Sequence, residues 1–152
     1  MADNMQALEE WVGPLLAKLD VKQRRALARN VARDLRRRQR DRIRAQTNPD
    51  GTPYAPRKPQ SFRAKQGSIR RRAMFSKLSN AKWLKATTQG DTALVGFFGN
   101  VARIATTHQR GLMDRVSRDG PRVEYQQREL LGFTALDREM IMDSVLTHLE
   151  GM

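Results

Sequence analysis

The feature that most constrains the fold of this chain is a long amphipathic segment that follows Asp20. A series of mostly apolar side chains recurs along it in steps of four: Leu27, Val31, Leu35, Gln39 and Ile43. Ala28 and Ala32 flank this series, and the period matches one face of an α-helix. Asp20 and Gln23 have the spacing of a capping box, which predicts where the helix begins. The segment therefore predicts a helix of about 25 residues that buries one narrow stripe.

A second series on the same segment consists of arginines. Residues 21–46 hold eleven basic groups and two acids, a net charge of +9. An unstructured basic tail would not alternate leucine and valine with arginine at a helical period, so we expect one side to pack and the other to face solvent or a partner. The candidate residues for electrostatic docking on this side are Arg29, Arg33, Arg36, Arg37, Arg40 and Arg44.

Charge is unevenly distributed along the whole chain. The 152 residues include 29 lysines and arginines against 16 aspartates and glutamates, a formal net charge of +13. Residues 1–20 and 134–152 each carry a net charge of −3, whereas no acidic residue occurs from Gly51 to Gly90. A chain polarised in this way attracts polyanions or acidic protein surfaces.

The N-terminal segment predicts a shorter helix. Helical spacing relates its apolar side chains, Leu8, Trp11, Val12, Leu15, Leu16 and Leu19. Gly13-Pro14 interrupts the segment, so the helix either restarts with Pro14 in its first turn or kinks there. Trp11, like Trp83 further along the chain, is expected to pack in the core.

A long loop is predicted from Thr47 to about Lys77, because TNPDGTPYAPRKPQ holds four of the six prolines and an Asp-Gly turn. Loops of this length are functional, disordered or ordered only by partners. One candidate interface is a shaped loop in which Tyr54 offers an anchor: Asp50, Gly51, Pro53, Tyr54 and Pro56. A second is a mobile basic contact: Arg70, Arg71 and Arg72. The alternatives are an ordinary turn and a disordered run.

The C-terminal half predicts strands and two more helices. AKWLKATT and DTALVGFFG form a hairpin around Gln89-Gly90-Asp91, with glycine in the left-handed position. Asn100 is placed to cap the helix VARIATTHQR, which Gly111 ends, and RVEYQQ is a third strand. Thr134 and Asp137 form a capping box. The last helix is predicted to direct these side chains inward: Leu136, Met140, Ile141, Val145 and Leu149.

This order of elements predicts an α+β fold. We expect one domain over residues 1–152, because domains of about 100–150 residues are the commonest. It would have N-terminal helices that include the long basic amphipathic helix, a small mainly antiparallel sheet, a short middle helix and a C-terminal helix.

The sequence gives no support for catalysis, a cofactor or a metal site. It contains no cysteine, and His108 and His148 lie forty residues apart without a second ligand at a diagnostic spacing. His108 is expected to be a hydrogen-bonded structural residue. The phosphate-binding patterns GxxxxGK and GxGxxG and the nucleophile pattern GxSxG are absent. We therefore expect no enzyme activity, no cofactor and no metal.

Membrane association is not expected either. The N-terminus MADNMQALEEW lacks the positive and apolar regions of a secretory signal. No window approaches about 18 uninterrupted apolar residues, the length that spans a bilayer. The stripe of the long helix has no Trp or Phe to enter a membrane surface. The sequence thus predicts a protein made in a cytoplasm.

Two interpretations of the arginines stay open. In the first, they bind nucleic-acid phosphates without sequence preference. Against it, no helix-turn-helix partner, zipper heptad or interleaved aromatic residue accompanies them. In the second, the arginines form a solvated face or an interface, because the planar guanidinium group pairs with carboxylates of acidic protein neighbours.

Several blocks of the sequence, in order, resemble the phage virion morphogenesis family, the tail completion proteins of contractile-tailed phages and related prophages. The resemblance extends from about Leu8 to Leu149, and its most specific blocks are NPDGTPYAPRK, VARIATTHQRG and RELLGF. It implies a structural assembly protein that finishes the head-proximal end of the tail in the host cytoplasm, so that the tail becomes stable and joins the DNA-filled head.

The resemblance also implies partners. Related tail-end proteins form rings, which suggests a hexamer of this chain that contacts tail tube and sheath proteins and the neck or head-completion proteins. In that setting the loop from Thr47 to about Lys77 is expected to be an arm that orders only on a tail or neck partner. Arginines facing the channel of a ring would touch DNA phosphates without recognising the sequence.

Overall fold

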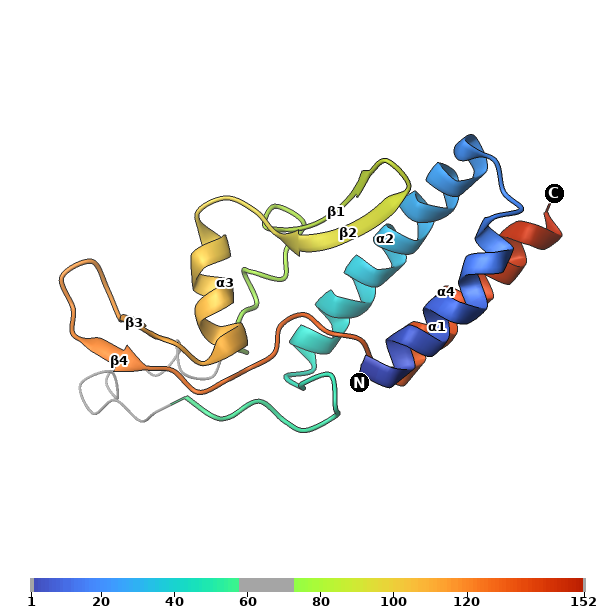
Figure 1. Ribbon diagram of the computed structural model, residues 1–152. Helices are drawn as coiled ribbons and strands as arrows, with labels where there is room; N and C mark the ends of the chain where they lie inside the picture. The colour runs from blue at the N-terminus through green and yellow to red at the C-terminus, as the bar shows by residue number, and fades with distance from the viewer. Residues whose placement is uncertain (1, 58–72, 152) are drawn as a thin grey trace. The chain divides into compact units, whose positions relative to one another are not determined.

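The computed structural model describes residues 2–57 and 73–151, which form four α-helices and four short strands (Figure 1). The helices are α1 (Ala2–Leu16), α2 (Val21–Arg44), α3 (Val101–Arg110) and α4 (Ala135–Glu150). The strands are β1 (Leu84–Gln89), β2 (Thr92–Phe97), β3 (Met113–Arg115) and β4 (Arg122–Glu124). The predicted α+β class is confirmed, including the long basic helix, the short middle helix and the C-terminal helix.

The described residues divide into two compact units. The first unit contains residues 2–38, 86–96 and 133–151, which include α1, α4, most of α2 and the turn of the β1–β2 hairpin. The second unit contains residues 39–57, 73–85 and 97–132, which include the end of α2, α3 and the β3–β4 hairpin. The single domain over residues 1–152 stays a prediction.

Helix α1 does not restart at Pro14 but includes that residue and ends at Leu16. The capping box ahead of α2 is confirmed. The Asp20 amide donates to Gln23 Oε1 at 3.0 Å, and the Gln23 amide donates to Asp20 Oδ1 at 2.8 Å. Helix α2 then continues for 24 residues, close to the predicted length.

The stripe at steps of four along α2 is buried as predicted: Leu27, Val31, Leu35, Gln39 and Ile43. In the first unit, the first three of these side chains join the core formed with Val12, Leu19 and Val145. Met140, Ile141 and Leu149 of α4 are partly buried against this core. Burial of each large aliphatic side chain stabilises the fold by about 1.5–3 kcal/mol.

Two side chains predicted to lie in the core are at the surface instead. Trp11 is 37% exposed because the neighbouring Val12, about 100° further round the helix, points to the core. Leu136 is 63% exposed because Asp137 turns inward in its place and pairs with Arg38. Trp83 is half-buried, with the Nζ of the adjacent Lys82 lying 4.7 Å from its ring centroid.

The β1–β2 hairpin turns at Gly90-Asp91, while Gln89 belongs to the strand. Gly90 has φ 62°, the left-handed conformation that was predicted. Gly111, which ends α3, is also left-handed, with φ 64° and ψ 53°. Asn100 precedes α3, but its side chain makes no capping hydrogen bond, because its backbone is helical (φ −62°, ψ −24°) rather than extended. The predicted cap is therefore wrong at Asn100.

Two separate two-stranded sheets replace the single small sheet that was predicted. The predicted third strand is shorter, Arg122–Glu124, and pairs antiparallel with β3 (Met113–Arg115), which the sequence analysis missed. Three residues are too few for an alternating pattern to be recognised in a sequence. The capping box of Thr134 and Asp137 ahead of α4 is confirmed.

Candidate partner-binding surface

The six arginines predicted to dock on a partner lie on one side of α2, and we call them the arginine ridge. Four are exposed, and Arg36 and Arg40 are half-buried. The Nη2 of Arg33 donates to Asn30 Oδ1 at 2.6 Å, and Arg40 pairs with Asp41 at 2.9 Å. Within the described residues, no side-chain hydrogen bond or ion pair reaches the other four: Arg29, Arg36, Arg37 and Arg44.

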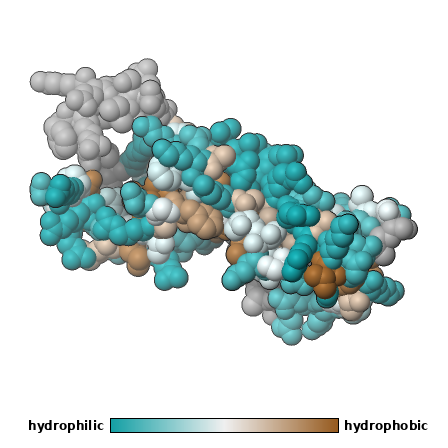
Figure 2. Space-filling model, turned by 90° about the horizontal axis from the view of Figure 1, so that it is seen from above, coloured by the Kyte–Doolittle hydropathy of each residue, from teal (hydrophilic) through white to brown (hydrophobic). Residues whose placement is uncertain are grey.

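The arginine ridge costs the helix some stability. Like charges four residues apart destabilise a helix by about 0.2–0.5 kcal/mol per pair. The ridge contains four such pairs: Arg29–Arg33, Arg33–Arg37, Arg36–Arg40 and Arg40–Arg44. A local choice that opposes stability is typical of a functional surface. An anionic partner would attract these guanidinium groups and offset the repulsion between them. Hydrophilic residues also dominate the face of the molecule seen in Figure 2.

Arg42, which the sequence analysis did not select, lies on the buried side of α2 and is 8% exposed. Its terminal nitrogens donate to the carbonyl oxygens of Thr47 at 2.9 Å, Glu129 at 2.9 Å and Leu130 at 2.7 Å. Arg42 thus ties the end of α2 to two other segments of the second unit. Its position seven residues after Leu35 on the buried stripe is the signal that identifies it in the sequence.

The loop after α2 forms a defined turn from Asn48 to Thr52. The amide of Gly51 donates to the Asn48 carbonyl at 2.9 Å, and Gly51 has φ 89°. The amide of Thr52 donates to Asp50 Oδ1 at 2.9 Å. The Thr52 hydroxyl, which also donates to this carboxylate, lowers the pKa of the exposed Asp50. The tip of the loop therefore presents a charged carboxylate on a fixed backbone.

Residues 128–132, which we call the clamped segment, form hydrogen bonds with the loop that follows α2. The Glu129 amide donates to Asn48 Oδ1 at 2.9 Å. Arg128 donates from Nε to the Ala55 carbonyl at 2.7 Å and from Nη2 to the Pro56 carbonyl at 3.0 Å. The expectation that this region orders only on a partner is therefore wrong for residues 47–57.

Two glutamines fix the clamped segment in turn. Gln109 of α3 accepts from the amides of Leu130 at 2.8 Å and Leu131 at 2.9 Å, and donates to the Leu131 carbonyl at 2.9 Å. Gln39 of α2 accepts from the Gly132 amide at 3.1 Å and donates to its carbonyl at 2.9 Å. The blocks NPDGTPYAP, VARIATTHQRG and RELLG, separate in sequence, thus meet in one polar network of the second unit.

Tyr54 does not offer its side chain to a partner, which corrects the predicted anchor. It is 5% exposed, and its hydroxyl donates to the Glu129 carbonyl at 3.0 Å. Burial raises the pKa of this phenol. The other four residues of the predicted loop interface are exposed: Asp50, Gly51, Pro53 and Pro56. The predicted contact at Arg70, Arg71 and Arg72 lies outside the described residues.

A row of aromatic rings packs behind the loop. Ring centroids are 5.7 Å apart for Tyr54 and Phe75, 4.8 Å for Phe75 and His108, and 4.9 Å for His108 and Tyr125. His108 Nδ1 is buried and has no hydrogen-bond partner within the described residues, so the predicted hydrogen-bonded role is wrong for this atom. Burial, and then the charge of Arg128, lower the pKa of His108 to about 4.

Acid is expected to destabilise the second unit through His108. Its folded-state pKa of about 4 lies below the ordinary value of 6.5, so between these values the unfolded chain binds a proton that the folded chain does not. This contribution to stability is complete above pH 6.5 and is lost as the pH falls toward 4. Thermal unfolding of His108→Phe should therefore depend less on pH in this window than that of the parent. Equal dependence in both proteins would contradict the prediction.

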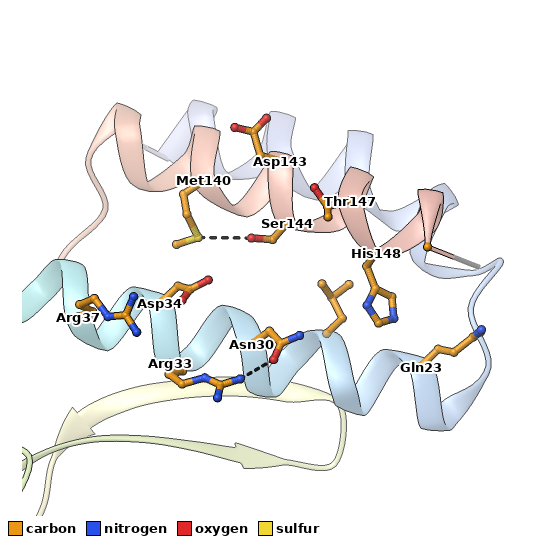
Figure 3. Close-up of a pocket in the computed structure, with 12 residues that line it drawn as sticks. Gln23, Asn30, Arg33, Asp34, Arg37, Met140, Asp143, Ser144, Thr147 and His148 are labelled. Carbon is orange, nitrogen blue, oxygen red and sulfur yellow. Dashed lines mark hydrogen bonds between the residues drawn. The ribbon is translucent and has the colours of Figure 1, made fainter.

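In the first unit, a groove of about 890 Å³ lies between α2 and α4 (Figure 3). Arg33, Asp34 and Arg37 line it from α2, and Asp143 and His148 line it from α4. Both signs of charge occur in the groove, so its charge selects no single class of small ligand. It does bring two residues of the arginine ridge opposite α4.

The described residues present groups that can bind a partner. Within residues 2–57 and 73–151, no three His, Cys, Asp or Glu side chains gather as metal ligands would. None of the helices in these described ranges combines the length and the apolar composition of a membrane-spanning segment. What the arrangement provides is a row of exposed guanidinium groups and, in the second unit, an ordered loop.

Comparison with known proteins gives a match along nearly the whole chain. Residues 3–150 match the phage virion morphogenesis family. The chain is 39% identical to the Tail completion protein S of Escherichia phage P2 over 149 residues, which cover 97% of this chain and 99% of that protein. No solved structure matches the chain.

Proposed function

This chain belongs to the phage virion morphogenesis family, and from this premise we propose that it is a structural tail completion protein. The similarity to the phage P2 protein carries the proposal, because it extends over nearly the full length of both chains. The protein acts by binding, without catalysis. It is assembled into the tail in the cytoplasm of the bacterial host.

In its finer form, the proposal places the protein at the head-proximal end of a contractile tail. There it stabilises the tail and enables joining to the head, in contact with tail tube and sheath proteins and with neck or head-completion proteins. The arginine ridge supports this role, because three of its members, Arg29, Arg37 and Arg44, are exposed and have no internal partner, and such guanidinium groups are suited to acidic protein surfaces. The ordered loop tip, with Asp50, Pro53 and Pro56, supplies a second contact.

We place several copies in a ring, expected to be a hexamer. A ring closes through two unlike, complementary surfaces on each copy, and the chain carries both signs of charge. Ridge arginines that face the channel of such a ring would touch DNA phosphates irrespective of sequence.

Charge reversal of the ridge tests the proposal. A phage that lacks its own copy of the gene is supplied with the variant Arg33→Glu, Arg36→Glu, Arg37→Glu and Arg40→Glu, and infectious particles and completed tails are counted. Like charges across an interface cost several kcal/mol, so we expect a fall on the order of 100-fold or more. The matched control reverses four exposed charges off the ridge by the same total, and should retain function: Lys18→Glu, Lys77→Glu, Lys85→Glu and Arg110→Glu.

The alternative function is sequence-independent nucleic-acid binding through the same helix. It predicts duplex affinity that falls steeply with salt, with a slope of about −0.9 per phosphate contacted. If the ridge variant loses duplex affinity while tail completion continues, the nucleic-acid function replaces the proposed one. If tail completion is lost while duplex affinity stays level, the alternative fails.

A further inference from the structure

The outer face of the β3–β4 hairpin holds two arginines directly opposite each other. The register pairs Met113 with Glu124, Asp114 with Val123, and Arg115 with Arg122. Asp114 turns inward, where it pairs with Arg103 of α3 at 3.4 Å. Because side chains alternate along a strand, Arg115 and Arg122 share the opposite, exposed face.

Backbone hydrogen bonds place these arginines close together. The Val116 amide donates to the Pro121 carbonyl, and the Tyr125 amide donates to the Leu112 carbonyl, both at 3.1 Å. Hydrogen-bonded and non-hydrogen-bonded pairs alternate along an antiparallel ladder. The Arg115–Arg122 pair is therefore a non-hydrogen-bonded pair, in which the Cα atoms approach to about 4.5 Å.

Such a pair is unfavourable for the isolated hairpin, because like charges directly opposite each other destabilise a sheet. Glu124 lies on the same face but forms no ion pair with either arginine. Two guanidinium groups at this separation are placed to bind carboxylates from outside. Met113, on the same face as the two arginines, is 58% exposed. An exposed apolar side chain beside arginine favours a protein partner over a phosphate backbone.

The complementary surface is present on α4. Its exposed residues include a stripe spaced by four, three and four residues, which we call the acidic stripe: Glu139, Asp143, Leu146 and Glu150. Asp143 also lines the groove between α2 and α4, to which Arg33 and Arg37 contribute from α2. All four side chains are exposed, and none of the three carboxylates has an ion-pair partner within the described residues. Leu146 is 41% exposed between them.

We propose that the outer face of the β3–β4 hairpin docks on the acidic stripe of a second copy of this chain. Arg115 and Arg122 pair with the carboxylates, and the exposed leucine of the stripe packs on Met113. The two surfaces are unlike, so one copy presents its hairpin to the next and its stripe to the one before, as a ring requires. The inference rests on the proposed self-assembly and names the surfaces that would make it.

A charge-swap experiment on the full chain tests this contact, with sedimentation velocity as the measure of self-association. The hairpin variant Arg115→Glu/Arg122→Glu and the stripe variant Glu139→Arg/Asp143→Arg should each weaken self-association by about 100-fold. The quadruple variant, which exchanges the signs of both surfaces, should restore it to within about 10-fold of the parent. The control Lys85→Glu/Arg110→Glu matches the charge change of the hairpin variant and should have no effect.

Circular dichroism establishes that each variant is folded. If one of the double variants does not fold, the quadruple variant still tests the contact. A monomeric parent, or self-association that neither double variant weakens, overturns the inference, as does a quadruple variant that fails to restore it. So does a hairpin variant that loses only duplex DNA affinity. Complementation of the phage separates the two proposals. If the hairpin variant self-associates like the parent and completes tails, the inference is wrong while the proposed function stands. Failure of the parent to complete tails sinks the proposed function alone.

Discussion

Replacing Arg42 with alanine is expected to lower the free energy of unfolding by at least about 2 kcal/mol, because each of the two carbonyl groups left without a donor costs about 1–3 kcal/mol. The substitution leaves the carbonyl oxygens of Thr47 and Leu130 without their donor, whereas the Glu129 carbonyl still accepts from the Tyr54 hydroxyl. The total free energy of unfolding of a domain of this size is about 5–15 kcal/mol, so the second unit should lose much of its order.

Urea denaturation and amide hydrogen exchange measure this effect. Exchange should speed up at Glu129, Leu130 and Leu131, whose amides are hydrogen-bonded in the polar network. The matched control is Arg44→Ala on the same helix, which removes an exposed guanidinium and should change stability by less than about 0.5 kcal/mol. Arg42→Lys should rescue only part of the loss, since a single ammonium group cannot reproduce the fork of donors. Equal stability of the two alanine variants would show that the network does not hold the second unit together.

Truncation of Leu130 to alanine is the second large effect. Leu130 is 0% exposed, and loss of a fully buried leucine costs about 2–5 kcal/mol through lost burial and the cavity left behind. Leu94→Ala serves as the matched control, because Leu94 is 39% exposed on β2 and lies outside the proposed interface.

Thermal unfolding of both leucine variants measures how much each side chain contributes to stability. We expect a marked fall in Tm for Leu130→Ala and almost none for Leu94→Ala. Limited proteolysis should also cut Leu130→Ala within residues 47–57, because the clamped segment that holds this loop is loosened. A loop that stays protected while Tm falls would mean that Leu130 stabilises the core without restraining the loop.

The sequence predicted the helices and their starts well because these depend on local periodicity and on neighbouring residues. The capping boxes at Asp20 and Thr134 each join residues three apart, so no distant contact is needed to recognise them. The left-handed glycines Gly90 and Gly111 follow in the same way from conformational freedom that other residues lack. The face of α2 that carries the arginine ridge was likewise set by spacing alone.

The rest depended on contacts between distant segments. Arg42, which was not selected, bonds to residues 87 and 88 positions away. Tyr54, which was predicted to be an anchor for a partner, is buried and bonds to a residue 75 positions away. Trp11 was assigned to the core on hydrophobicity, although only the packing of α1 decides which side of the helix is covered. The three conspicuous blocks were recognised as a likeness, and only the folded chain brings them into one network.

The turn from Asn48 to Thr52 has a defined backbone conformation without a bound partner. Restricting a backbone residue to one conformation has an entropic cost of about 1–2 kcal/mol, which a disordered segment must meet at the moment of binding. Here folding has met that cost, through hydrogen bonds that reach Asn48, Ala55 and Pro56 from residues 128 and 129. The affinity of the loop tip for a partner is therefore coupled to the folding of the second unit, to which the loop belongs. Mild acid or a distant core substitution should weaken docking without altering a single contacting side chain.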